Sequence, residues 1–182
     1  MLSNFYTTDE LNSLGFKSFG KNVKISRKCS IYNAELIKIG DNVRIDDFCI
    51  LSGNIKIGNY IHIAAYSALY GKYGIEIEDF CGISARGTIY SAIDDFSGSA
   101  MISPMVPDEY TNLITGKVVL KKYTQLGYNT VIFPRCILNE GVATGAMTLI
   151  KKTVPSWKIV AGIPAKIIGN RKTDIIELSK KI

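Results

Sequence analysis

Histidine is nearly missing from this chain: among 182 residues there is one, His62. Zinc catalysis generally takes three protein ligands, so we expect no metal cofactor. The four cysteines show no paired spacing such as C-x-x-C, which argues against a disulfide framework or a cysteine-rich metal site. No apolar run approaches the ~20 residues of a membrane span, and the N-terminal residues lack the basic flank and apolar core of a signal peptide. We therefore expect a cytoplasmic protein without a membrane partner.

The charge is moderately positive, with 22 lysines and arginines against 16 acidic residues and a net charge of +6. This favours an anionic partner, either nucleic acid or a phosphorylated small molecule. The chain has no lysine-rich run and no aromatic RNA-binding signature, so we expect no nucleic-acid partner. Its length suits a single domain over residues 1–182.

An isoleucine or leucine recurs at every sixth position through the middle of the chain. The longest unbroken series is Ile39, Ile45, Leu51, Ile57, Ile63, Leu69 and Ile75. A period of six fits neither a helix nor simple strand alternation. It is typical of a β-solenoid in which each short flat side contributes one aliphatic residue and three sides make a triangular coil. The predicted fold is therefore an all-β, parallel β-helix of hexapeptide repeats with about six coils.

A second row of small or β-branched residues lies two positions before these aliphatic residues. Side chains two apart share a face of a strand, so both rows should point inward. All four cysteines belong to this row, and we expect them to be buried thiols that act as small hydrophobic residues. They are Cys29, Cys49, Cys81 and Cys136.

Three segments depart from the repeat. Thr7–Glu10 resembles a capping box and predicts a short helix that stops at Gly15. Residues 94–116 lose the repeat yet stay apolar, which is typical of a functional loop rather than a disordered one. Thr173 is expected to cap a short C-terminal helix. The exposed flat sides of such a solenoid favour a homotrimer with clefts between subunits.

Residues 154–168 read Val-Pro-Ser-Trp-Lys-Ile-Val-Ala-Gly-Ile-Pro-Ala-Lys-Ile-Ile. This matches the ending V-P-x-x-x-x-x-x-G-x-P-A-[KR]-x-[IL] of the hexapeptide-repeat acyltransferases. With the register and the interrupting loop, it makes nearly the whole chain resemble these left-handed β-helix enzymes. The resemblance implies the left-handed coil, which the spacing does not show, and acetyl-CoA or another acyl-CoA as co-substrate.

Segments 44–53, 62–66 and 93–98 most resemble the N-acyltransferases that act on dTDP-linked amino-deoxy sugars. That resemblance implies acyl transfer from acyl-CoA to the amine of a nucleotide sugar for surface polysaccharide or O-antigen synthesis. The alternative is an O-acetyltransferase that acts on a sugar or antibiotic hydroxyl. O-acetyltransferases of this superfamily carry a catalytic histidine in a motif like I-Y-T-A-T-H-P, and Asp94 stands at that position here. An amine needs positioning more than the strong general base that an alcohol requires. A structural or ice-binding solenoid should show regular T-x-T ranks, which are absent.

The candidate catalytic residues are Asp94, His62 and Ser84. His62 follows one inward residue and precedes another, so it points outward, either as an acid–base group or as a surface histidine without a role. Asp94 aligns with the family's histidine, although aspartate is also common in turns. Ser84 lies on the same outward rim.

Candidate substrate-binding residues are Arg86, Tyr90, Asp95 and Tyr66. Arg86 is suited to nucleotide phosphates and a tyrosine to the thymine ring, although such residues are also common on surfaces without function. For the coenzyme, the family resemblance implies that the pantetheine arm lies along the later coils against small residues. Lysines near the C-terminal end suit its phosphates, unless they form only a solvated basic tail. The candidate coenzyme-binding residues are Gly127, Gly145, Ala146, Lys151, Lys152, Pro164, Lys166 and Arg171.

Overall fold

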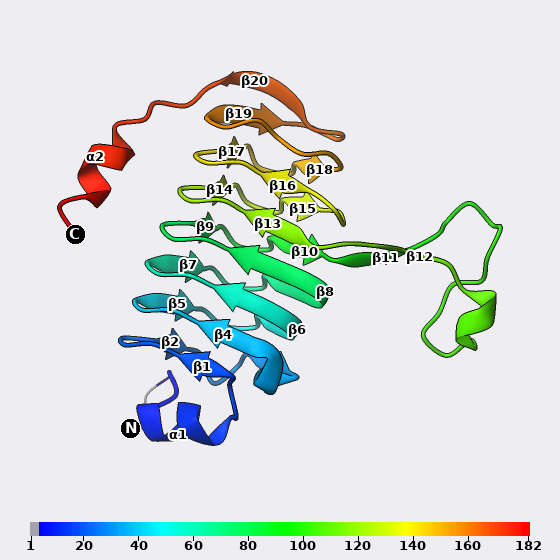
Figure 1. Cartoon of the computed structure of the whole chain (residues 1–182), viewed down its shortest axis with the longest axis horizontal. Helices are drawn as coiled ribbons and strands as arrows, with labels where there is room; N and C mark the ends of the chain where they lie inside the picture. Colours follow the sequence, from blue (N-terminus) through cyan, green and yellow to red (C-terminus); the bar gives the residue numbers. More distant parts are fainter. Residues whose placement is uncertain (1–3) are drawn as a thin grey trace.

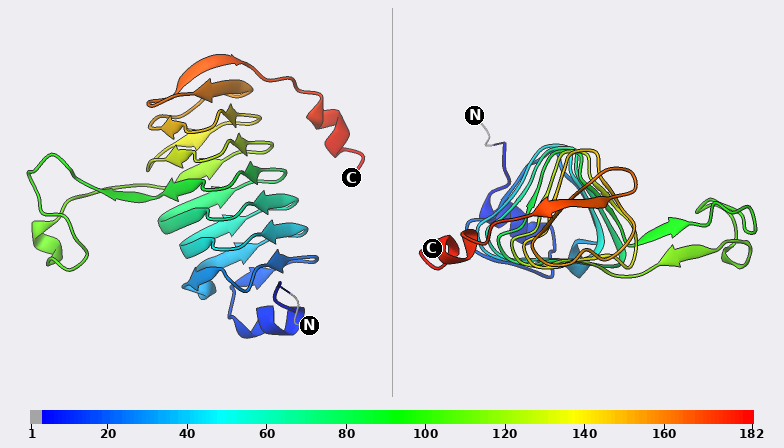
Figure 2. Two further views of the ribbon diagram at one scale, coloured as in Figure 1. Left: turned by 180° about the vertical axis from the view of Figure 1, so that it is seen from behind. Right: turned by 90° about the horizontal axis from the view of Figure 1, so that it is seen from above.

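The computed structural model describes residues 4–182; residues 1–3, part of the N-terminal segment judged not to be a signal peptide, lie outside it. The chain winds into a parallel β-solenoid of about seven turns, one more than the sequence predicted (Figure 1). Seen along its axis, the solenoid is triangular (Figure 2). The predicted all-β fold is confirmed, and the architecture is consistent with a left-handed β-helix.

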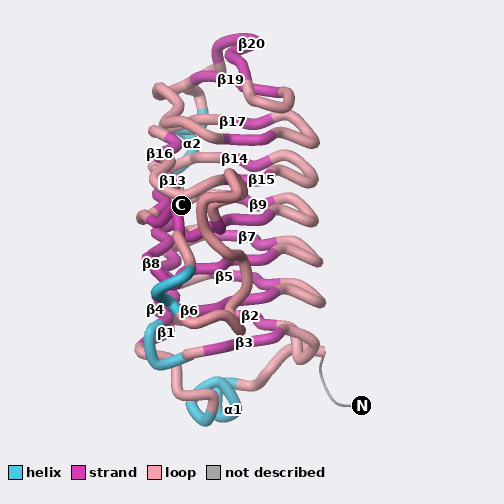
Figure 3. Tube along the Cα trace, turned by 90° about the vertical axis from the view of Figure 1, so that its right-hand side faces the viewer, coloured by secondary structure: helices cyan, strands magenta, loops and turns pink. Residues whose placement is uncertain are grey.

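The strands of successive coils stack in ranks separated by loops at the corners (Figure 3). One flat side, which we call side A, consists of β2 (Lys24–Ile25), β5 (Val43–Ile45), β7 (Ile61–Ile63), β9 (Gly82–Ile83), β14 (Gln125–Leu126), β17 (Ala143–Thr144) and β19 (Lys158–Ala161). The antiparallel strand β20 (Lys166–Asn170) pairs with β19 and closes the C-terminal end. The sequence did not predict this closing hairpin.

The other two sides share one sheet, because β6 (Ile50–Ile57) and β8 (Ala68–Ile77) are long enough to pass around a corner. Side B comprises β3 (Ser30–Tyr32), the first halves of β6 and β8, β10 (Thr88–Tyr90), β15 (Val131–Ile132) and β18 (Leu149–Ile150). Side C comprises β1 (Ser18–Phe19), β4 (Ile37–Ile39), the second halves of β6 and β8, β13 (Val118–Leu120) and β16 (Ile137–Leu138). A 3-10 turn, η1 (Ala34–Leu36), precedes β4.

Parallel pairing places aliphatic residues of successive coils directly over one another. Ile45 pairs with Ile63 and Ile63 with Ile83, so coils of 18 residues (45 to 63) and 20 residues (63 to 83) follow each other. All seven members of the longest predicted series are buried, which confirms the inward row. Close burial of one aliphatic residue per side is what holds a coil to its neighbours.

Three of the four cysteines are buried as predicted, but Cys29 is only half-buried. It lies in the first coils, where one neighbouring layer is incomplete, and its thiol donates to the carbonyl of Asp46 at 3.1 Å. Burial raises the pKa of Cys81 to about 12 and that of Cys136 to about 11. These thiols are therefore inert at neutral pH.

Large residues occupy several corners of the solenoid. At the corner before side A, Tyr60, Phe80, Tyr123 and Trp157 adopt left-handed backbone angles, with φ between +56° and +64°. Their rings form an aromatic ladder: Tyr60 stacks on Phe80 at 4.9 Å between centroids, and Phe80 stacks on Tyr123 at 5.5 Å. Ring stacking of this kind contributes about 0.5–1.5 kcal/mol per pair, enough to offset much of the backbone strain.

Short helices lie near both ends of the chain. Helix α1 (Thr8–Ser13) begins with the predicted capping box, in which the Glu10 amide donates to Thr7 and the Thr7 amide donates to the Glu10 carboxylate. Helix α2 (Ile175–Ser179) also forms, but the predicted cap at Thr173 is wrong. Its N-cap residue is Asp174, which makes no side-chain capping bond.

The interrupting segment is an ordered arm, which we define as residues 92–115. Strands β11 (Ala92–Asp94) and β12 (Leu113–Thr115) pair antiparallel, and the chain between them contains a 3-10 turn, η2 (Asp108–Tyr110). The arm projects from one corner of the solenoid (Figures 1 and 2). Several large apolar side chains remain exposed on it, including Phe96 at 77% and Met105 at 89%.

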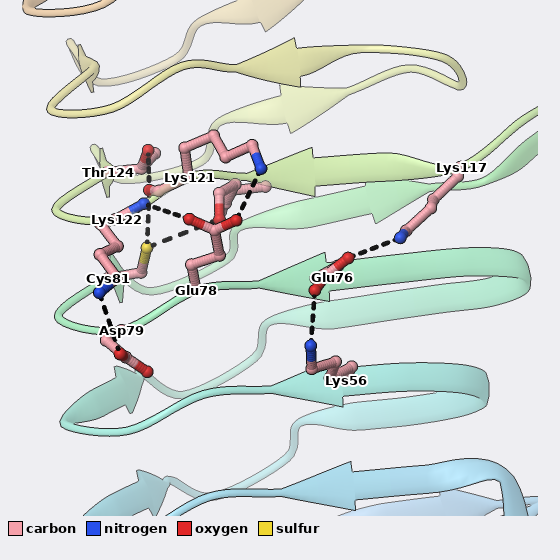
Figure 4. A network of polar contacts seen from close by, with 10 residues as sticks. Lys56, Glu76, Glu78, Asp79, Cys81, Lys117, Lys121, Lys122 and Thr124 are labelled. Carbon is pink, nitrogen blue, oxygen red and sulfur yellow. Dashed lines mark hydrogen bonds and ion pairs between the residues drawn. The ribbon is translucent and has the colours of Figure 1, made fainter.

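Ion pairs on side C fasten the base of the arm to the solenoid (Figure 4). Glu76 accepts bonds from Lys56 at 2.8 Å and from Lys117, two residues after the end of the arm, at 2.5 Å. The hydrogen bonds from Lys117 and Lys56 lower the pKa of Glu76 from its ordinary 4.5 to about 2. A folded-state pKa below the unfolded value stabilises the fold above pH 4.5, and this contribution disappears as the pH falls toward 2.

We therefore expect Glu76→Gln to flatten the loss of thermal stability between pH 4.5 and pH 2. Thermal unfolding followed by circular dichroism across this range measures the slope. Glu35→Gln is the control, because Glu35 is exposed and forms no ion pair within the described residues. If both variants keep the wild-type slope, Glu76 does not carry this pH dependence.

Candidate active site

A hollow of about 470 Å³ lies on side A, around the outward face of β9. His62 and Ser84, two of the predicted catalytic residues, both line it. They meet because β7 and β9 are neighbours in register, with His62 paired to Gly82 two residues before Ser84. His62 is exposed, as its outward position predicted. We call this feature the side-A hollow.

Asp46, which the sequence analysis did not single out, holds His62. Its carboxylate lies 2.7 Å from the histidine Nε2 and accepts a second bond from Arg44 Nε, also at 2.7 Å. The pKa of Asp46 is lowered, because these two hydrogen bonds outweigh the opposing effect of burial. The sequence held one clue to this contact, because the repeat places the Asp46 carboxylate on the outward face one coil before His62. The pair fixes which imidazole nitrogen faces the carboxylate.

Arg86 and Tyr66 occupy the other corner of side A. The Arg86 guanidinium lies over the Tyr66 ring at 5.5 Å, and Tyr66 stacks on Phe48 at 5.0 Å. Both Arg86 and Tyr66 are exposed, so they remain available to a ligand. Tyr90 lies elsewhere, stacked on Tyr70 at 5.2 Å on side B, where burial raises its pKa.

The two aspartates at the start of the arm differ in their surroundings. Asp94 is the last residue of β11 and does not line the side-A hollow of its own chain. Asp95 accepts bonds from the Ser97 amide, Ser99 and Asn112, which lower its pKa to about 2. The predicted substrate contact of Asp95 stays a prediction; its carboxylate is already used to fold the arm.

The predicted contact of the pantetheine arm with Gly127 and Gly145 stays a prediction, but their backbone amides already have partners within the solenoid. The Gly127 amide donates to Thr144 Oγ1 at 2.8 Å, and the Gly145 amide donates to the Val160 carbonyl at 2.7 Å. A Cβ at Gly127 would lie 2.6 Å from the Thr144 carbonyl oxygen, so coil stacking itself requires this glycine. Ala146 is exposed at the next corner, where a ligand has access to it.

Half of the predicted coenzyme-binding residues meet at the C-terminal end. Lys151, Lys152, Pro164 and Lys166 line one cavity of about 470 Å³, which we call the donor-end cavity. The lysines surround an apolar floor that includes Val160, a suitable setting for a heterocycle with attached phosphates.

Arg171 does not line the donor-end cavity. Its Nη1 donates to the carbonyl oxygens of Tyr123 and Gly141, at 2.5 and 3.2 Å, and burial lowers its pKa. The predicted phosphate contact of Arg171 stays a prediction; in this structure the residue holds the last turn against the aromatic ladder. Its position in a basic C-terminal stretch gave no sign of this.

Within residues 4–182, no three histidine, cysteine or acidic side chains lie close enough together to hold a metal ion. No helix in that part of the chain has the length and apolarity to cross a membrane.

Comparison with known proteins agrees with this geometry. Residues 37–71 match the family model described as bacterial transferase hexapeptide (six repeats). The chain is 45% identical over 172 residues to dTDP-4-amino-4,6-dideoxy-D-glucose acyltransferase from Escherichia coli, covering 93% of this chain and 90% of that protein.

Two crystal structures of AntD, an N-acyltransferase from Bacillus cereus, are 52% identical with TM-scores of 0.97. One, in complex with dTDP and 3-hydroxybutyryl-CoA, covers 99% of this chain and 96% of AntD. The other, a variant with dTDP-4-amino-4,6-dideoxyglucose and coenzyme A, covers 99% and 97%.

The solenoid, its arm and its closing segment thus define a hexapeptide-repeat transferase, and the chain belongs to that family. Within the family, it is similar over nearly its whole length to N-acyltransferases of dTDP-linked amino sugars.

Proposed function

We propose that this protein transfers an acyl group from an acyl-CoA to the amine of a dTDP-linked amino-deoxy sugar. The observation that carries the proposal is near-full-length identity of 45% and 52% to enzymes named for this reaction or crystallised with its ligands. The side-A hollow and the donor-end cavity supply a reaction site and a phosphate site that suit it. We propose further that the product serves surface polysaccharide synthesis, including O-antigen, and that the enzyme is cytoplasmic.

In the proposed reaction, the neutral sugar amine attacks the thioester carbonyl. A C–N bond forms, the C–S bond breaks, and the departing coenzyme A thiolate takes the surplus proton directly or through water. His62, held by Asp46, and Ser84 orient the acceptor at the hollow. Because the Gly127 and Gly145 amides are occupied, the exposed Ser84 hydroxyl is the better candidate to stabilise the oxyanion.

The remaining site residues divide between the two substrates. Lys151, Lys152 and Lys166 bind the coenzyme phosphates, and Pro164 packs on the adenine. Arg86 binds the nucleotide diphosphate beside Tyr66. These assignments rest on charge, exposure and position.

We also propose a homotrimer in which the arm carries Asp94 toward the hollow of a neighbouring subunit. Asp94 does not line the hollow of its own chain, and exposed apolar side chains on the arm favour docking against protein. Light scattering at micromolar concentration should give three times the 20.0 kDa chain mass. Phe96→Glu with Met105→Glu should weaken the assembly, whereas Lys180→Glu at the C-cap of the C-terminal helix should not. A wild-type monomer would contradict the proposal.

The proposed chemistry needs no side chain as an obligatory base. Removing a true general base typically costs about 10²–10⁴-fold in rate. We expect Asp94→Asn and His62→Asn each to keep kcat within about two orders of magnitude of wild type, measured by release of the coenzyme A thiol. Loss of turnover in either variant, with normal sugar binding, would identify that residue as the base.

The Asp46–His62 pair favours a second candidate function, O-acetyl transfer to a sugar or antibiotic hydroxyl. A histidine held 2.7 Å from a carboxylate is the arrangement that a general base for an alcohol requires. The thiol-release assay, run in parallel with amino and hydroxyl acceptors, separates the two. Turnover only with hydroxyl acceptors would overturn the N-acyltransferase proposal.

A further inference from the structure

A single glycine interrupts the column of outward side chains on side A. Register places Arg44, His62, Gly82 and Gln125 over one another on β5, β7, β9 and β14. His62 and Gln125 are thus separated by one coil that carries no side chain. The side-A hollow occupies this gap.

The fold itself does not require glycine at position 82. Gly82 does not adopt a left-handed backbone angle, and a Cβ there would meet only the end of the Gln125 side chain, with Oε1 at 2.2 Å. By contrast, a Cβ at Gly40 would lie 2.6 Å from the backbone oxygen of Gly58 in the next coil. Glycine within a strand weakens it and often marks a place where a ligand approaches closely.

The walls of the gap have a definite chemistry. Tyr60 and Phe80, stacked at 4.9 Å, provide apolar surface on one flank, and Ser84 lies on the other. Gln125 Nε2 donates to the Phe80 carbonyl at 3.0 Å, which fixes the amide and directs its Oε1 over Gly82. The gap is therefore bounded on its C-terminal side by a fixed amide and is apolar along one flank.

We propose that this gap receives the acyl chain of the donor, and that Gly82 and Gln125 determine which chain lengths fit. The inference rests on the proposed function and names the acyl group of that same site. Lys151 follows β18 at the corner between sides B and C, which is also the corner from which the arm leaves after β10. In the proposed trimer, a donor held by its phosphates at that corner of one subunit is therefore brought, with the arm, to the side-A hollow of the neighbouring subunit, where its acyl chain meets Gly82. An aromatic flank with few polar groups suits an alkyl chain better than a hydroxylated sugar.

The test compares acetyl-CoA with butyryl-CoA in Gly82→Ala and Gln125→Ala. A methylene added to or removed from a pocket typically changes kcat/KM by about 10–200-fold. Gly82→Ala narrows the gap, so the ratio of kcat/KM for butyryl-CoA to that for acetyl-CoA should fall by about tenfold or more. Gln125→Ala lengthens the gap, so the same ratio should rise. Gly169→Ala is the matched control, because its added Cβ meets no atom closer than 4.0 Å.

Isothermal titration of both acyl-CoAs provides a readout that does not depend on turnover. Gly82→Ala should weaken binding of butyryl-CoA relative to acetyl-CoA by a similar factor. If the butyryl-CoA to acetyl-CoA ratios stay unchanged in both variants, the inference is wrong. It is also wrong if only KM for the nucleotide sugar rises, because the gap would then bind the acceptor. The wild type could fail to acylate any amino sugar while the variants still shift the butyryl-CoA to acetyl-CoA binding ratio as expected. In that case the proposed acceptor is wrong, but the gap still binds the acyl chain.

Discussion

Reversing the charges of Lys151 and Lys166 together is expected to raise KM for acyl-CoA by about 100-fold, with kcat within a few-fold of wild type. Hydrogen bonds to charged groups contribute about 1.5–3 kcal/mol each, and 1.4 kcal/mol corresponds to a factor of ten. Both lysines line the donor-end cavity, away from the side-A hollow. Contacts remote from the reacting carbon act equally on bound substrate and transition state, so their loss appears in KM.

Steady-state kinetics of Lys151→Glu/Lys166→Glu, with each substrate varied in turn, measures the effect. The matched control is Lys24→Glu on β2, an exposed lysine at the opposite end of the solenoid. KM for the nucleotide sugar should not follow KM for acyl-CoA. An equal rise in both KM values would show that the coenzyme phosphates do not bind in this cavity.

The core of the fold was predictable because its determinant is periodic. One aliphatic residue per flat side is a constraint that every coil repeats, so Ile45, Ile63 and Ile83 could be placed from spacing alone. Features that occur once were less accessible. Examples are the closing strand β20 and the pairing of β11 with β12. Both depend on antiparallel contacts that are not part of the six-residue repeat.

In the candidate site, too, the features that follow from the repeat were predictable and those that occur once were not. Residues whose direction follows from the repeat, such as His62 and Ser84, were placed on the correct face. Hydrogen-bond partners were not predictable, because they depend on which atoms of neighbouring coils lie within about 3 Å. Three contacts were therefore missed: the hydrogen bond of the Gly127 amide, the bonds by which Arg171 holds the last turn, and the Asp46–His62 pair.

The second large effect concerns the core. Leu51→Ala should destabilise the protein by about 2–5 kcal/mol, the usual cost of truncating a fully buried leucine. Leu51 is 0% exposed and stands between Ile31 and Leu69 of the adjoining coils. For a chain of this length, each 1 kcal/mol lowers the melting temperature by about 2–4 °C. We therefore expect a drop of roughly 4–20 °C by calorimetry at matched protein concentration.

Ser52→Ala is the control, because Ser52 is the next residue on the same strand and points outward, and it should change stability by no more than about 0.5 kcal/mol. In a solenoid each coil contacts only its neighbours, so a cavity at Leu51 weakens two adjacent interfaces at once. The N-terminal coils should then lose amide-exchange protection before those beyond the arm, because the break isolates the shorter stack. Uniform loss of protection along the chain would show instead that the solenoid unfolds as one cooperative unit.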